Sequence, residues 1–165
     1  MELSEAYMPI DRRYALARGQ NLPERANGTV LFADISGFTP LTAALLKELG
    51  LNRGPEELIR QLNLVYDALT GEVHRYGGSV IGFSGDAITC WLNGDDGLRA
   101  LACGLAMQQA ITRFRAIKTP TRTPVSLGMT VAIAAGSVRR FLVGDPSIQY
   151  IDVLAGATLT RMAAA

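Results

Sequence analysis

The sequence has few cysteines, almost no net charge and no long apolar run. Its two cysteines, Cys90 and Cys103, lie inside apolar segments, so we expect small buried thiols and not the paired cysteines of a secreted domain. The formal net charge of +1 gives no basic surface for nucleic acid, and no acidic tail is present. No apolar run approaches the ~20 residues of a membrane span. The N-terminus, with Glu2 and Glu5, lacks the basic-then-apolar order of a signal peptide, so we expect a cytoplasmic protein.

The composition is that of one globular domain. The chain has 165 residues, of which 48% are hydrophobic, enough for a core of its own. We expect a polar N-terminal arm over residues 1–27 and the domain over residues 28–165.

Periodicity predicts the order of strands and helices. The strands expected are 28–33, 79–83, 87–92, 125–134, 138–143 and 149–154, with a turn at Ala135-Gly136. The helices expected are 41–50, 55–77, 97–114 and one that begins at Gly156. Because strands and helices mix without strict alternation, we predict an α+β fold, with an antiparallel-rich sheet and helices packed on one face.

Several single residues have an expected place in this fold. In the helix 97–114 the residues expected to face inward are Leu98, Leu101, Ala102 and Leu105. Trp91 is expected in the core or on a dimer face, and His74 on the surface. The arginines at 12, 13, 139 and 140 are interpreted as solvated charges, although one of the last two can reach a triphosphate or a partner.

Two carboxylates stand out because each ends a predicted strand. Asp34 follows the strand 28–33, and Asp86 lies at the tip of the hairpin formed by 79–83 and 87–92. If the first strand lies beside the hairpin, the two side chains meet at one edge of the sheet. Since like charges repel, a cation between them explains the pair best, and oxygen ligands favour Mg²⁺ or Mn²⁺.

The turn after Asp34 is suited to binding a phosphate group. Ser36 and Gly37 lead into a helix, whose first N–H groups are free to receive phosphate oxygens at the positive end of the helix dipole. The alternative is an Asp or Ser that only caps a helix after an ordinary buried strand.

The two segments together resemble the class III nucleotidyl cyclases, the adenylate and guanylate cyclases. Residues 32–39 read FADISGFT and residues 77–87 read GGSVIGFSGDA. The resemblance covers residues 28–165 and is closest in character to soluble adenylyl cyclases with two tandem cyclase domains. It implies a ferredoxin-like βαββαβ core.

The resemblance also implies a site and a reaction. Asp34 and Asp86 would hold two Mg²⁺ or Mn²⁺ ions, and the Ile35 carbonyl would be a further ligand. The residues that would contact the phosphates are Ser36, Gly37, Phe38, Thr39 and Gly85. The reaction would convert ATP to 3′,5′-cyclic AMP and pyrophosphate.

The sequence departs from the family pattern in the other half of the site. Gly82 stands where the family has a lysine, while Asp152 matches the position that reads the base and suits the amine of adenine. Aligned without gaps, the family's asparagine and arginine positions hold Leu159 and Ala163, and Arg161 is out of phase on the helix. The resemblance therefore implies the metal-binding half of a pair, inactive until a second cyclase domain joins it, and a domain that is incomplete at its C-terminus.

Other interpretations stay open at this stage. The chain can be a catalytically silent cyclase-like domain that binds nucleotide or a partner and regulates attached domains. A related fold such as a diguanylate cyclase is less consistent, because its Gly-Gly-Asp/Glu-Glu-Phe hairpin tip is replaced here by Ser84-Gly85-Asp86. A plain binding module is the remaining alternative.

Overall fold

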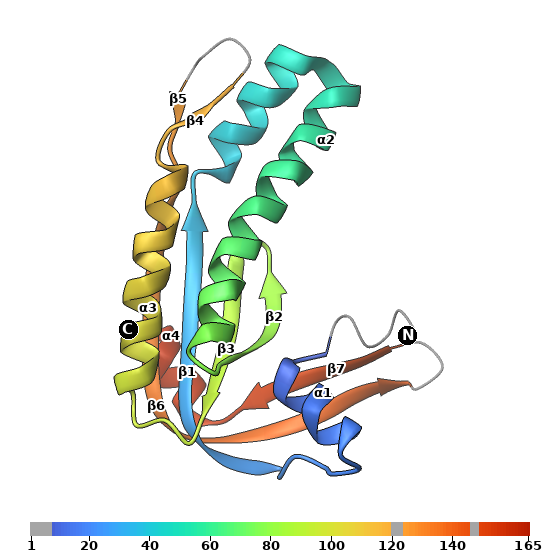
Figure 1. Ribbon diagram of the computed structural model, residues 1–165, viewed down its shortest axis with the longest axis vertical. Coiled ribbons are helices and arrows are strands. Elements are labelled where there is room, and N and C mark those ends of the chain that lie inside the picture. Colours follow the sequence, from blue (N-terminus) through green and yellow to red (C-terminus); the bar gives the residue numbers. More distant parts are fainter. Residues whose placement is uncertain (1–7, 120–123, 146–148) are drawn as a thin grey trace.

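A five-stranded sheet in the order β2-β3-β1-β6-β7 organises the chain (Figure 1). The computed structural model describes residues 8–119, 124–145 and 149–165. The strands are β1 (Arg25–Ser36), β2 (Ser79–Ser84), β3 (Ala87–Asn93), β6 (Gly128–Asp145) and β7 (Gln149–Ala155). Every neighbouring pair in this sheet is antiparallel, which confirms the predicted α+β class. Two short strands, β4 (Ile117–Lys118) and β5 (Pro124–Val125), form a separate two-stranded sheet.

The long helices cover one face of the sheet (Figure 1). They are α2 (Phe38–Arg75) and α3 (Leu98–Ile111), and α3 continues into the 3₁₀ turn η2 (Thr112–Phe114). The two helices predicted at 41–50 and 55–77 are joined in α2, with a break at Gly50, where φ is 76° and ψ is −179°. No helix in the described part of the chain is long and apolar enough to cross a membrane.

Two shorter helices lie outside the layer formed by α2 and α3. The helix α4 (Ala157–Ala163) packs against the opposite face, through Met162. The helix α1 (Ile10–Ala17) contacts β2 and precedes β1, which already begins at Arg25. Residues 8–27 are therefore packed partly onto the sheet, while the division into an arm and a domain remains a prediction.

Buried side chains form one cluster on each face of the sheet. Leu31 and Ile35 of β1 belong to the larger cluster, under α2 and α3, whereas Val30 belongs to the smaller one, near α4. This alternation is expected of a strand covered on both sides. Trp91 is buried in the smaller cluster, as predicted, and His74 is exposed.

The two cysteines are free and buried, which confirms the prediction made for them. Burial raises the pKa of Cys103 to about 11, helped by the negative charge of Glu72, and burial raises the pKa of Cys90 further. Both side chains are therefore neutral thiols at neutral pH, and they act as small core residues.

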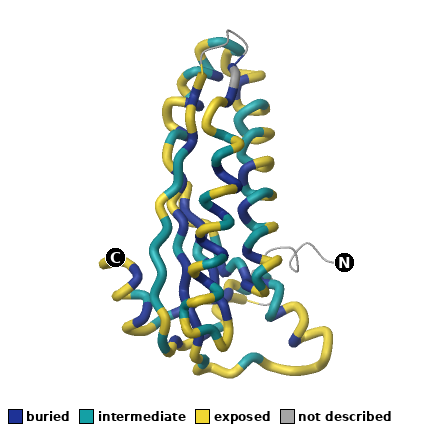
Figure 2. The backbone as a smooth tube through the Cα atoms, turned by 60° about the vertical axis from the view of Figure 1, so that its left-hand side comes forward, coloured by how far each residue is buried: buried dark blue, intermediate teal, exposed yellow. Residues whose placement is uncertain are grey.

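The predicted inner face of α3 is wrong. Leu98, Leu101 and Leu105 are 71%, 51% and 64% exposed, while Cys103 and Met107 are buried. Figure 2 shows how buried, intermediate and exposed positions alternate along the helices that cover the sheet. The reason is the close approach of α3 to the sheet, since a methyl group at Gly104 would lie 3.2 Å from Val131 Cγ1. Small side chains permit that approach, and the leucines consequently face outward.

The predicted turn at Ala135-Gly136 is also wrong. The strand β6 runs without interruption from Gly128 to Asp145. Its residues 128–139 pair with β1 in unbroken register, with Gly136 opposite Gly28. Gly136 has a φ of 156°, near the extended region, so the chain continues there and does not reverse.

The close packing around β1 generates a stability prediction. A methyl group at Gly28 would overlap the carbonyl oxygen of Leu92 and lie 2.7 Å from the Trp91 ring. Gly28→Ala is therefore expected to lower the free energy of unfolding by about 1–3 kcal/mol in urea denaturation. Gly82→Ala is the matched control, because no neighbouring atom lies within 4 Å of the added methyl group. Equal stability of both variants would contradict the packing described.

Candidate active site

The structure brings the segments of the two predicted aspartates together. The strands β1 and β3 are neighbours, and Asp34 lies opposite Ala87, the residue after Asp86. The Ile35 N–H donates a hydrogen bond to the carbonyl oxygen of Asp86, 3.3 Å away. Gly85, with a φ of 59°, and Asp86 form the two-residue turn between β2 and β3. Both aspartates are exposed, so their carboxylates are open to a ligand.

The turn between β1 and α2 leaves the helix start open. Gly37 is the N-cap residue, in the left-handed region with a φ of 102°, and no side chain caps the helix. The Leu41 N–H donates to the Gly37 carbonyl, 3.2 Å away. The first N–H groups of any α-helix lack intrahelical acceptors, so those of Phe38 and Thr39 are available next to Asp34. The side chains of Ser36 and Thr39 are exposed, and that of Phe38 is buried.

Tyr66 of α2 contacts both the hairpin turn between β2 and β3 and the start of α2. Its hydroxyl donates to the Gly85 carbonyl oxygen at 3.4 Å. Its ring packs edge-on against Phe83, with centroids 5.0 Å apart, and lies 6.4 Å from the ring of Phe38. Partial burial, and then the negative charge of Asp86, raise the pKa of Tyr66. Tyr66 lies in the helix predicted at 55–77, and no motif of the sequence indicates its contact with the site.

The donor set fits a hard cation that is shared with a ligand. Exposed carboxylates are the ligands that Mg²⁺ and Mn²⁺ prefer. Residues 8–119, 124–145 and 149–165 contain no group of three or more His, Cys, Asp or Glu side chains that could hold a metal. Asp34 and Asp86 therefore supply two carboxylates, and phosphate oxygens, water or the predicted Ile35 carbonyl would have to complete the shell.

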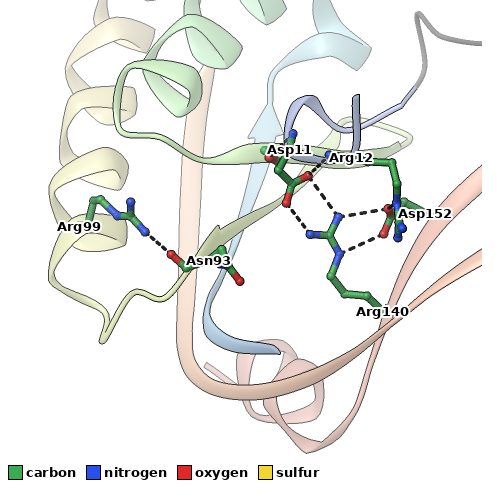
Figure 3. A network of polar contacts seen from close by, with 7 residues as sticks. Asp11, Arg12, Asn93, Arg99, Arg140 and Asp152 are labelled. Atoms are coloured by element: carbon green, nitrogen blue, oxygen red, sulfur yellow. Dashed lines mark hydrogen bonds and ion pairs between the residues drawn. The ribbon is translucent and has the colours of Figure 1, made fainter. Parts of the chain in front are cut away.

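Asp152 of β7 lies in a buried network of charges (Figure 3). Arg12 Nε donates to its Oδ2 at 2.7 Å, and Arg140 donates from Nε to Oδ1 at 3.2 Å and from Nη2 to Oδ2 at 3.1 Å. Arg140 also pairs with Asp11 of α1. Burial lowers the pKa of Arg140, but the hydrogen bonds and charges of Asp11 and Asp152 outweigh it, and the net shift is upward.

This network corrects two predictions for the arginines. Arg12 and Arg140 were expected as solvated charges, yet their side chains are 7% and 2% exposed. Their burial depends on the partners that Asp11 and Asp152 provide, since an unpaired charge would not be buried. Arg13 and Arg139 are exposed, as expected.

A groove of about 390 Å³ joins three of the positions that the sequence singled out. Gly82 of β2, Asp152 of β7 and Leu159 of α4 all line it. Ala163 is exposed at the end of α4, and Arg161 donates to the carbonyl oxygen of Ala135 at 2.9 Å. The groove therefore brings together the three positions that correspond to the family's lysine, base-reading residue and asparagine. The position that corresponds to the family's arginine, Ala163, lies further along α4.

Comparison with known proteins adds to this geometry. No family model matches the chain. Adenylate cyclase type 10 of the mouse is 27% identical over 150 residues, which cover 84% of this chain and 9% of the relative. The crystal structure of the guanylyl cyclase Cya2 is similar, with a TM-score of 0.66 and 27% identity over 85% of this chain and 68% of that one. The chain resembles class III nucleotidyl cyclase catalytic domains in sequence and in fold.

A third similarity covers nearly the whole chain. A bacterial light-regulated adenylyl cyclase has a TM-score of 0.75 and 23% identity, over 97% of this chain and 46% of that one. At this identity the likeness shows the fold. The chain spans only 9% of the mouse relative's length, so that similarity concerns one segment of a much longer protein.

Tyr66 offers a spectroscopic test of the arrangement of this candidate site. Because the charge of Asp86 raises the phenol pKa, Asp86→Asn should lower the pKa of Tyr66 in an ultraviolet titration. Tyr66→Phe identifies which of the five tyrosines gives the signal. A Tyr66 titration that is the same with and without the Asp86 charge would contradict the placement of Tyr66 beside this turn.

Proposed function

We propose that this cyclase domain is the metal-binding half of an adenylate cyclase, which converts ATP to 3′,5′-cyclic AMP and pyrophosphate. The observation that supports it is the β1–β3 register, which sets Asp34 opposite the residue that follows Asp86. The open start of α2 lies at the end of the same strand. In this proposal the metal ligands and the N–H groups that bind phosphate come from neighbouring segments at one end of the sheet.

Each group in this proposal has a defined task. Asp34, Asp86 and the Ile35 carbonyl hold two Mg²⁺ or Mn²⁺ ions. When bound, the ions favour ionisation of the ribose 3′-hydroxyl and neutralise charge on the leaving pyrophosphate. The N–H groups from Ser36 to Thr39, with Gly85, bind the β- and γ-phosphates and align the α-phosphate. The 3′-oxygen loses its proton and forms a bond to the α-phosphorus, and the bond from that phosphorus to the pyrophosphate oxygen breaks.

The remaining groups come from a second cyclase domain in this proposal. Gly82, Leu159 and Ala163 offer no positive charge or amide where the resemblance implies lysine, asparagine and arginine. A fungal guanylyl cyclase domain of similar fold is dimeric. The groove of about 390 Å³ is flanked by apolar side chains suited to a partner, since Phe83 and Ile151 are each 55% exposed.

A catalytically silent regulatory domain is the second candidate. It is favoured by the engagement of the Asp152 carboxylate with Arg12 and Arg140 within the chain. Such a domain would bind nucleotide or a partner without turnover, so catalysis in a reconstituted pair separates the two candidates.

Metal-dependent nucleotide binding tests the site itself. Isothermal titration with Mn²⁺ and a non-cyclisable ATP analogue should show binding that Asp34→Asn and Asp86→Asn each weaken by at least about tenfold, because each variant removes a charged ligand. Asp96→Asn is the charge-matched control, since Asp96 follows the far end of β3 and accepts a hydrogen bond from the Leu98 N–H. Unchanged affinity in both site variants would eliminate the two-metal proposal.

Complementation tests whether a second cyclase domain must supply the lysine, asparagine and arginine. The chain alone should produce almost no cyclic AMP. Adding a cyclase domain that carries the lysine, asparagine and arginine, but has its own metal-binding aspartates replaced, should raise the rate at least about hundredfold. Asp34→Asn should abolish that gain. Full activity of the chain alone, lost in Arg161→Ala, would show that Arg161 serves this domain and that no second domain is needed.

A further inference from the structure

The outer face of α3 is apolar and open to solvent. Leu98, Leu101 and Leu105 are 71%, 51% and 64% exposed. Their spacings of three and four residues put them on one side of the helix, opposite the side chains that pack on the sheet. Arg99 is the only charged residue among the 14 residues of α3. A helix with apolar side chains all round is typical of a position covered on both sides, so this face is expected to have a partner.

The two ends of this apolar face carry opposite charges. Asp96 precedes α3, is exposed, and accepts a hydrogen bond from the Leu98 N–H. Arg113 and Arg115 follow α3 and are also exposed. Leu105 lies near the middle, nine residues after Asp96 and eight residues before Arg113. The surface is therefore acidic at one end, apolar in its centre and basic at the other end.

A second copy of this surface, turned end to end, is complementary to the first. A two-fold axis at Leu105 sets the acidic end of each copy against the basic end of the other and brings the leucines together. The same rotation brings Leu98 of the second copy opposite Thr112 of the first. Thr112, Ala106 and Gln109 line a groove of about 310 Å³ between α3 and α2. This groove offers a hole for the leucine side chain of the second copy.

We propose that α3 is the contact of an antiparallel dimer, in which a second copy of this chain covers Leu98, Leu101 and Leu105. The apolar centre supplies the association energy, and the charged ends fix the orientation of the two helices. One helix face per copy is small beside the roughly 1,200–2,000 Å² that specific interfaces bury. The dimer is therefore expected to be reversible.

This contact is separate from the pairing of cyclase domains in the proposed function. The helix α3 packs on the larger core cluster through Cys103 and Met107, whereas Leu159 of the groove beside Gly82 packs against the smaller cluster on the opposite face. The α3 dimer consequently leaves that groove accessible to a second cyclase domain. It needs neither Asp34 nor a metal ion, so the failure of the proposed function would leave this inference standing.

Sedimentation velocity from about 10 µM to about 1 mM tests the dimer. The sedimentation coefficient of the natural chain should rise with concentration from the monomer value towards the dimer value. Leu105→Lys should remain a monomer over this range, because the two-fold axis would bring two ammonium groups together in an apolar contact. Leu51→Lys is the matched control and should dimerise like the natural chain, since Leu51 is 83% exposed on α2, outside this contact.

Cysteine cross-linking tests the antiparallel order. Oxidation of a mixture of Leu98→Cys and Thr112→Cys by dissolved oxygen should give a disulfide between one copy of each variant, identified by the mass of the linked peptides. Leu98→Cys alone should give little product, because the two copies of this position lie at opposite ends of the contact. The natural Cys90 and Cys103 are buried, and they should not contribute.

Three results would overturn the proposal. The first is a natural chain that stays monomeric at about 1 mM. The second is a dimer that Leu105→Lys leaves intact, since it would use another surface. The third is a predominant cross-link between two Leu98→Cys chains, which would require a parallel pair. An unchanged midpoint of urea unfolding in dilute Leu105→Lys shows that the variant is folded, and the cross-linking decides the matter if it is not.

Discussion

The pairing of β1 with β3 is the constraint on which the site depends. β1 is buried on both faces and hydrogen-bonds to β3 on one side and β6 on the other, so its register is held by two ladders and two core clusters. A slip of one residue would send every side chain of the strand to the opposite face. That register determines which residue of the hairpin lies beside Asp34, near the end of β1.

The predicted metal-binding aspartates and Asp152 are held by different kinds of interaction. Around Asp34 and Asp86 the supports are backbone geometry, with Gly37 and Gly85 in positive φ, and the aromatic contacts of Tyr66. Around Asp152 the support is a set of buried charges in which two arginines match two aspartates. Backbone and aromatic supports change little with a ligand, whereas a charged network can exchange one partner for another. The two predicted metal-binding aspartates are therefore exposed, while the Asp152 carboxylate is engaged within the chain.

Prediction from sequence succeeded where local pattern and global fold agree. The hairpin around Ser84-Gly85-Asp86 and the strand before Asp34 are short apolar runs bounded by turn residues, and both were located to within a few residues. It was wrong where the outcome depended on packing distance. The outer leucines of α3 resemble an inward stripe, but Gly104 lets the opposite face approach the sheet. Gly136 resembles a turn residue, but its pairing with β1 carries the strand through.

The sequence by itself determined the α+β class of the chain and the residue types of the predicted metal site. The motifs 32–39 and 77–87 place a carboxylate and a glycine turn after a buried strand, and such features are local. Only the tertiary structure decided the partners of Asp152, which are 140 and 12 residues away along the chain. Arg12 has the sequence context of a surface charge, and its burial depends on the acidic partner, Asp152, that β7 presents to α1. Pairings at that separation depend on how the sheet is assembled, and no periodicity within one segment encodes them.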